Sequence, residues 1–109
     1  MASTYKVLAQ SAPSATTNTD VYTVGSGKSA VISTITVCNR SASSATYRVA
    51  IRVAGSTLSN EEYIAYDAVL PGSDTIALTF GVTLAATDVI TVYASTANVS
   101  FNIFGSEIA

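Results

Sequence analysis

Short segments of alternating apolar and polar residues run along this chain, most clearly between residues 30 and 53. Residues 47–53 alternate strictly, with Arg48, Ala50 and Arg52 on one side of an extended chain and larger apolar residues on the other. This is the pattern of a strand with one face in a core. The side chains expected on the buried face are Tyr47, Val49, Ile51 and Val53.

Residues 30–39 form a longer segment that is rich in β-branched residues, which favour strands. Here Val31, Ile35 and Val37 fall on one face and Ile32 on the other, so we expect a strand that is more deeply buried than its neighbour. Residues 39–44 have the composition of a polar turn. Residues 30–53 therefore predict a central antiparallel hairpin.

Further strands are expected elsewhere along the chain, and no segment has a sustained helical period. Residues 89–94 and 99–104 predict a second hairpin, with Val99, Phe101 and Ile103 facing inward and Phe104 outward. Residues 5–9 are either a short edge strand or an arm. The other expected strands are residues 20–24, 61–67 and 75–80.

This spacing of about seven or eight strands predicts one all-β domain over residues 1–109, an antiparallel two-sheet β-sandwich or jelly roll. An immunoglobulin-like sandwich is the alternative. Residues 1–19 are expected to form an N-terminal arm and linker, because residues 10–19 are polar and interrupted by Pro13.

Charged residues make up only 11% of the 109 residues, well below the roughly 25% of an average soluble domain. A small, neutral surface rich in hydroxyl groups has little charge repulsion, which favours packing against other subunits. The five basic residues are not clustered and the net charge is −2, so we expect no nucleic-acid partner. We expect no membrane partner either, because no apolar run approaches the ~20 residues of a transmembrane helix.

Candidate catalytic chemistry is sparse. The chain has no histidine and a single cysteine, Cys38, which we expect to be a small buried hydrophobic residue within a strand. The seven acidic residues are scattered, which gives no metal loop and little support for a glycosidase pair. Residues 25–28 have glycines and a lysine, but a β-rich run follows, so they predict a tight turn and not a phosphate loop. We expect no catalytic, metal or cofactor site.

Arg48 and Arg52 are two of the five basic residues and are spaced to lie on one side of their strand, about 13 Å apart. Arginine is enriched at protein interfaces because its planar group pairs bidentately with carboxylates, so both are candidate contact residues. The alternative is a solvated sheet face. Tyr5 in the N-terminal segment and Phe104 on the outward side of its strand complete the expected interface residues.

Three tyrosines leave a second interpretation open. Tyr63, Tyr66 and Tyr93 form a sugar-stacking platform if they are exposed and coplanar, although aromatic residues in strands more often lie in the core.

Five segments in a fixed order resemble a family of small virion structural proteins of tailed bacteriophages, notably those of cyanobacteria. They are YKVLAQSAP (residues 5–13), VISTITVCNR (31–40), YIAYD (63–67), LAATDV (84–89) and SFNIFGSE (100–107). Members often have a proline in the turn after the second strand, where this chain has Gly25–Gly27.

The resemblance implies a non-enzymatic virion protein that is made in the cytoplasm of the bacterial host. Its expected role is capsid decoration, in which a cement protein stabilises the head through contacts with the major capsid protein. It also implies a homotrimer, since decoration proteins commonly occupy local three-fold positions. The alternative is a tail, neck or fibre-associated module that binds a host-surface glycan or another virion protein.

Overall fold

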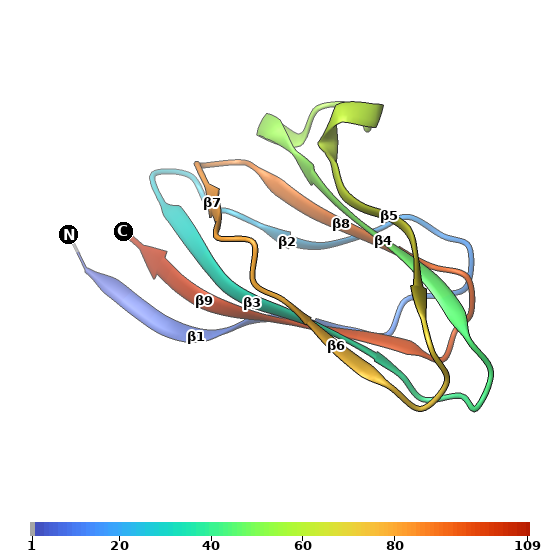
Figure 1. Cartoon of the computed structure of the whole chain (residues 1–109). Coiled ribbons are helices and arrows are strands. Elements are labelled where there is room, and N and C mark those ends of the chain that lie inside the picture. The colour runs from blue at the N-terminus through green and yellow to red at the C-terminus, as the bar shows by residue number, and fades with distance from the viewer. Residues whose placement is uncertain (1) are drawn as a thin grey trace.

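The computed structural model describes residues 2–109, which form nine strands in two antiparallel sheets (Figure 1). Sheet A has the order β1-β9-β3-β6, and β7 also pairs with β3; sheet B has the order β2-β8-β4-β5. The strands of sheet A are β1 (Ser3–Ser11), β3 (Ser29–Asn39), β6 (Thr75–Leu78), β7 (Val82–Leu84) and β9 (Val99–Ile108). The strands of sheet B are β2 (Thr19–Thr23), β4 (Ala45–Arg52), β5 (Tyr63–Leu70) and β8 (Val89–Ala94).

The expected all-β sandwich is confirmed, and its strand order is that of a jelly roll. β6 and β7 pair with successive parts of β3 and so act as one interrupted strand, which accounts for nine strands where about eight were expected. The immunoglobulin-like alternative is wrong, because that fold groups its strands differently between the two sheets.

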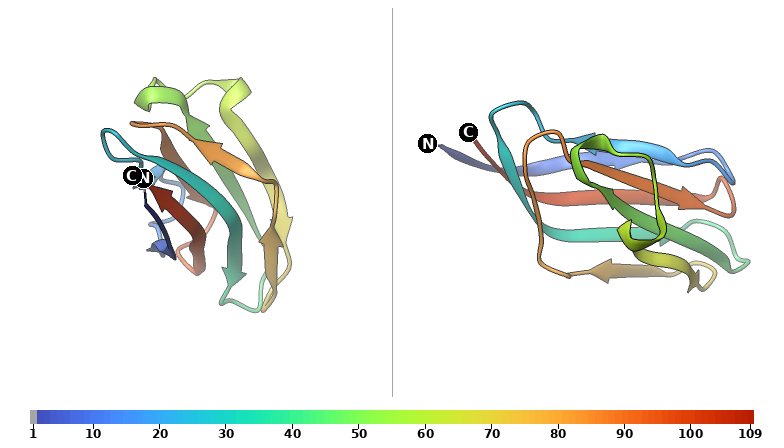
Figure 2. Two further views of the ribbon diagram at one scale, coloured as in Figure 1. Left: turned by 90° about the vertical axis from the view of Figure 1, so that its left-hand side faces the viewer. Right: turned by 90° about the horizontal axis from the view of Figure 1, so that it is seen from above.

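Of the two expectations for the N-terminal segment, the structure shows the edge strand. β1 pairs with β9 from Ser3 to Ser11, and the chain ends meet where the Ala109 N–H donates to the Ala2 carbonyl (2.9 Å). Figure 2 shows both termini on the same side of the molecule. Within residues 2–109, the strands are connected by turns and two short 3₁₀ segments, η1 (Val53–Gly55) and η2 (Asn60–Glu62), and no helix is long and apolar enough to span a bilayer.

Both predicted hairpins are wrong. β3 lies in sheet A and β4 in sheet B, and likewise β8 lies in sheet B and β9 in sheet A. Alternation shows which side of a strand is buried, but it does not distinguish a partner in the same sheet from one that faces it across the core. The polar turns at residues 40–44 and 95–98 therefore carry the chain from one sheet to the other.

The turn after β3 is fixed by Asn39, whose side chain is buried. Its amide nitrogen donates to the carbonyls of Ser43 (2.8 Å) and Leu70 (3.3 Å), while its oxygen accepts the Ser41 N–H (3.0 Å). A buried amide must have such partners to avoid a desolvation penalty, so these bonds tie the turn to the end of β5. Gly72 fits against this turn, because a Cβ atom there would lie 2.0 Å from the Ala42 carbonyl oxygen.

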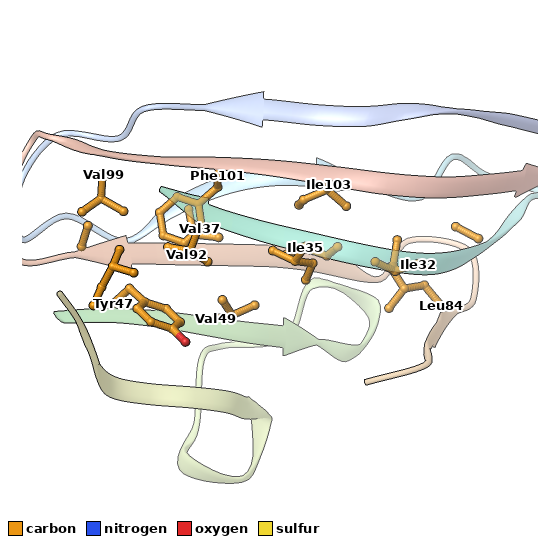
Figure 3. Close-up of a cluster of buried hydrophobic side chains, with 14 of the residues drawn as sticks. Ile32, Ile35, Val37, Tyr47, Val49, Leu84, Val92, Val99, Phe101 and Ile103 are labelled. Carbon is orange, nitrogen blue, oxygen red and sulfur yellow. The ribbon is translucent and has the colours of Figure 1, made fainter. Parts of the chain in front are cut away.

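The core lies between the two sheets, and its central side chains are shown in Figure 3. Val99, Phe101 and Ile103 are buried as predicted. Each fully buried apolar side chain of this size contributes about 1.5–3 kcal/mol relative to an exposed one. The buried residues labelled in the figure are Ile32, Ile35, Val37, Tyr47, Val49, Leu84, Val92, Val99, Phe101 and Ile103.

Four predicted side-chain positions are wrong. Ile32 faces the core with Ile35, and Val31 faces outward, because the register of β3 shifts at Ser33 and reverses the alternation. Val53 is exposed because β4 ends at Arg52 and the chain turns into η1. Cys38 is only half-buried, because it follows the inward-facing Val37 and lies on the outer side of sheet A.

We expect Gly105→Ala to destabilise the fold. A Cβ atom at residue 105 would lie 2.1 Å from the backbone oxygen of Val31, so β9 and β3 would have to separate locally. The expected loss in the free energy of unfolding is about 1–3 kcal/mol, measured by urea denaturation. Gly25→Ala is the control, since its nearest atom is the flexible Lys28 side chain at 3.4 Å. Equal stability of the two variants would contradict the prediction.

Candidate functional site

The four residues expected at an interface lie on opposite faces of the sandwich. Tyr5 and Phe104 are on the outer face of sheet A, whereas Arg48 and Arg52 are on the outer face of sheet B. The two arginines share one side of β4, as their spacing predicted. The structure therefore offers two separate candidate surfaces.

The first surface, here called the sheet A patch, consists of Tyr5, Val7, Val31 and Phe104. Tyr5, Ser106 and Val31 lie in one row across the sheet, because Ser106 pairs with both of the others. Val7 pairs with Phe104 in the next outward-facing row. The exposed fraction is 85% for Tyr5, 48% for Val7 and 40% for Val31. A shallow depression of about 300 Å³ lies among Tyr5, Lys6, Val31 and Phe104.

Two β-bulges lie close to this depression. β3 shifts register between Ile32 and Thr34, and β1 shifts between Val7 and Ala9, so the neighbours of Phe104 are irregular on both sides. Such bulges bend a strand and redirect its side chains. The Ser33 hydroxyl donates to the Phe104 carbonyl (3.1 Å), which satisfies a backbone acceptor at the distorted point.

The paired outward positions of sheet A are all uncharged. They are Ser3, Tyr5, Val7, Gln10, Ser29, Val31, Thr34, Thr36, Cys38, Thr75, Ala77, Thr83, Ser100, Asn102, Phe104, Ser106 and Ile108. This face presents hydroxyl, amide and apolar groups without the charges that normally keep a surface in water.

The charged residues of β1 and β9, Lys6 and Glu107, alternate with the outward positions of these strands. Lys6 pairs with Glu107 (2.8 Å), which also accepts a hydrogen bond from the Tyr22 hydroxyl of sheet B (2.6 Å). Lys6, followed by Tyr22, lowers the pKa of Glu107, while burial and then Glu107 raise the pKa of Tyr22. These groups link the two sheets at one end of the sandwich, and Lys6, which also borders the depression, is neutralised there by Glu107.

The second surface, here called the arginine–tyrosine cluster, consists of Arg48, Tyr63, Tyr66, Asp67 and Tyr93. The guanidinium carbon of Arg48 lies 4.3 Å from the centre of the Tyr66 ring and 4.1 Å from that of Tyr93. Arg48 also pairs with both carboxylate oxygens of Asp67, at 2.6 and 3.2 Å. A partly buried cation between two rings gains about 0.5–2 kcal/mol per ring.

A β-bulge in β5 explains how Arg48 reaches both Tyr66 and Asp67. Tyr47 pairs with Ala68 and Val49 pairs with Ala65, so the single residue Arg48 faces two residues of β5. Asp67 adopts a positive φ of 48°, which lets these consecutive residues both contact the Arg48 side chain. Asp is among the residues that tolerate this conformation best. Sequence reasoning treated Asp67 as one of several scattered acids, because an alternating pattern does not reveal a bulge.

Arg52 is held by contacts within the chain. It donates to the Asp20 carboxylate (2.7 Å), the Thr91 hydroxyl (3.0 Å) and the carbonyls of Gly55 (3.1 Å) and Ser56 (3.0 Å). The donors of this guanidinium are therefore largely engaged in joining β4 to β2, β8 and η1.

The three tyrosines lie outside the core, on the outer side of sheet B. They do not form the coplanar platform considered from the sequence, because the rings of Tyr63 and Tyr66 meet edge to face at 83° with centres 4.8 Å apart. A depression of about 480 Å³ is lined by Asn60, Tyr63 and Tyr66. Tyr66 remains 58% exposed although Arg48 covers one face of its ring.

Over residues 2–109, no group of three or more His, Cys, Asp and Glu side chains comes together in a way that would hold a metal ion.

We expect Asp67→Asn to weaken the loss of stability in acid. The hydrogen bond from Arg48 lowers the pKa of the Asp67 carboxyl, so the unfolded chain binds this proton more readily than the folded chain. The stabilisation is present above the unfolded pKa of about 3.9 and is lost as pH falls through the lower folded value. Thermal melts below about pH 4 should therefore fall less steeply for the variant than for the parent chain.

Asp74→Asn is the control for this measurement. Asp74 belongs to none of the ion pairs formed by residues 2–109, and its carboxylate accepts the neighbouring Thr75 N–H (2.9 Å). An acid dependence that is unchanged in Asp67→Asn would show that the pair with Arg48 contributes nothing to stability.

Comparison with protein-family models, curated proteins and solved structures found no match for this chain.

Proposed function

We propose that this protein is a non-enzymatic structural component of a tailed-phage particle, most simply a capsid-decorating protein. The sheet A patch is the observation that carries the proposal. It combines exposed apolar side chains with a whole sheet face whose paired outward positions are uncharged. A surface of this kind marks a protein contact more often than a free surface.

The size of the face suits a stable contact. The longest dimensions of the domain are 45 and 28 Å, and a standard interface needs about 800 Å² from each partner. The strand order adds support by analogy only, since jelly rolls recur in viral capsid proteins but fold alone does not assign function. The resemblance of five segments to phage virion proteins points in the same direction.

The proposed partners are other copies of this chain, with a trimer favoured, and the major capsid protein. The sheet A patch provides the contact, while Arg48 and Arg52 serve mainly within the domain because their donors are already paired there. Under this proposal, neither arginine is a main contact residue of the oligomer or the capsid.

The function is tested on particles of the phage that encodes the chain. We expect mass spectrometry to detect the protein in purified particles, and cryo-electron microscopy to show a jelly-roll domain outside the capsid shell. Density at the neck or tail would support a virion role but overturn capsid decoration. Particles that lack the chain would overturn the whole proposal.

We also predict that Tyr5→Thr combined with Val31→Thr prevents self-association. Both side chains are exposed on strands, and threonine keeps a strand-favouring residue while removing apolar surface. Light scattering should return the mass of one chain, 11.2 kDa, for this variant and a multiple of it for the parent chain.

The matched control places two substitutions on the opposite face. Arg48→Gln combined with Arg52→Gln should leave the oligomer intact. Loss of the oligomer only in this control would locate the contact on sheet B. A parent chain that remains monomeric at high concentration would contradict self-association altogether.

A further inference from the structure

The arginine–tyrosine cluster borders a depression on the face opposite the sheet A patch. Asn60, Tyr63 and Tyr66 line this depression, which has a volume of about 480 Å³. Tyr66 is 58% exposed, which leaves much of a large aromatic ring free to contact a ligand. Because Arg48 already covers one face of its ring, the exposed area lies on the remaining ring surface.

The residues around the depression are held in place before any ligand arrives. Arg48 and Asp67 fix the Tyr66 side of the bulge, and Tyr63 supports the ring by an edge contact. Asn60 is the first residue of η2, which is capped where the Ser59 N–H donates to Glu62 (3.0 Å). Rigid aromatic and amide groups of this kind lose little entropy when they bind a ligand.

The charges nearby select against ionic ligands. A cation on Tyr66 would meet the field of the Arg48 guanidinium, which lies 4.3 Å from the ring centre. An anion would meet the carboxylates of Glu61, Glu62 and Asp67, which occupy η2 and the bulge. Arg48 and Asp67 neutralise each other, so an uncharged ligand encounters the smallest electrostatic penalty.

We propose that the depression is a binding site for a neutral carbohydrate, with room for about one or two sugar rings. The apolar C–H face of a pyranose stacks on the exposed part of Tyr66, and Tyr63 borders its edge. The Asn60 amide supplies both a donor and an acceptor for sugar hydroxyls. A flat platform of three rings is not required, because one exposed ring and one flanking ring suit a single sugar unit.

The site is tested by titrating the isotopically labelled full chain with neutral probes, maltohexaose and chitotetraose. Nuclear magnetic resonance should show shifts of the Tyr63 and Tyr66 ring signals and the Asn60 amide signal, with a dissociation constant on the order of 1 mM for at least one probe. Choline and sialyllactose are the cationic and anionic counter-probes. Equal or stronger binding of either one would overturn the neutral class of ligand.

Two variants locate the binding site. Tyr66→Ala should weaken binding about tenfold, and Asn60→Ala, which leaves both rings in place, should weaken it several-fold. Tyr5→Ala is the matched control, because it removes an exposed tyrosine on the opposite face and should leave binding unchanged. The proposal is overturned if neither neutral probe shifts the Tyr63 and Tyr66 signals at about 20 mM, or if Tyr5→Ala reduces binding as much as Tyr66→Ala.

Discussion

The fold depends on how the chain crosses between the two sheets. It passes from one sheet to the other at every connection between consecutive strands except β4–β5 and β6–β7. Each crossing places two consecutive strands in opposite sheets, so the core between the sheets, not backbone pairing, holds them together. Backbone pairing instead joins distant segments, as in β1 with β9 and β3 with β9. The fold therefore requires both the apolar core and these long-range ladders, and neither forms from local contacts alone.

The polar groups at the crossings make this arrangement possible. Asn39 is buried at the end of β3, and its bonds to Ser43 and Leu70 join a crossing turn to the neighbouring sheet. The adjacent crossing from β8 to β9 is tied to the same region, since the Arg40 N–H donates to the Asn98 carbonyl (2.8 Å). Apolar burial stabilises the layers, and these hydrogen bonds specify where the chain moves between them.

The strands and the buried sides of most of them could be predicted from the sequence, because period-two alternation reports burial directly. Val99, Phe101 and Ile103 are a clear case. The pairing of β3 with β9 could not be predicted in this way, since alternation contains no information about which strand is the neighbour. The reversal of Val31 and Ile32 was also hidden, because the extra residue at Ser33 puts the residues before it out of phase with Ile35 and Val37 after it.

The candidate surfaces were predictable only in part. The spacing of Arg48 and Arg52 correctly predicted that both side chains lie on the same side of β4. Phe104 was also correctly expected to face outward. The partner of Arg48 was not predictable, because Asp67 reaches it through a backbone conformation that no sequence pattern indicates. The sequence also could not show that Tyr5 and the arginines lie on opposite faces, since that follows from the assignment of strands to sheets.

Both candidate surfaces arise from departures from regular sheet geometry. Paired shifts in β1 and β3 surround Phe104 on sheet A, and the bulge in β5 places Tyr66 and Asp67 opposite Arg48 on sheet B. A regular jelly roll with the same composition would expose flatter faces with alternating side chains. The bulges place Phe104 and Tyr66 at these two surfaces, while Val37, Val49 and Val92 stay buried in the core. This separation allows side chains at either surface to change without loss of the packing that defines the fold.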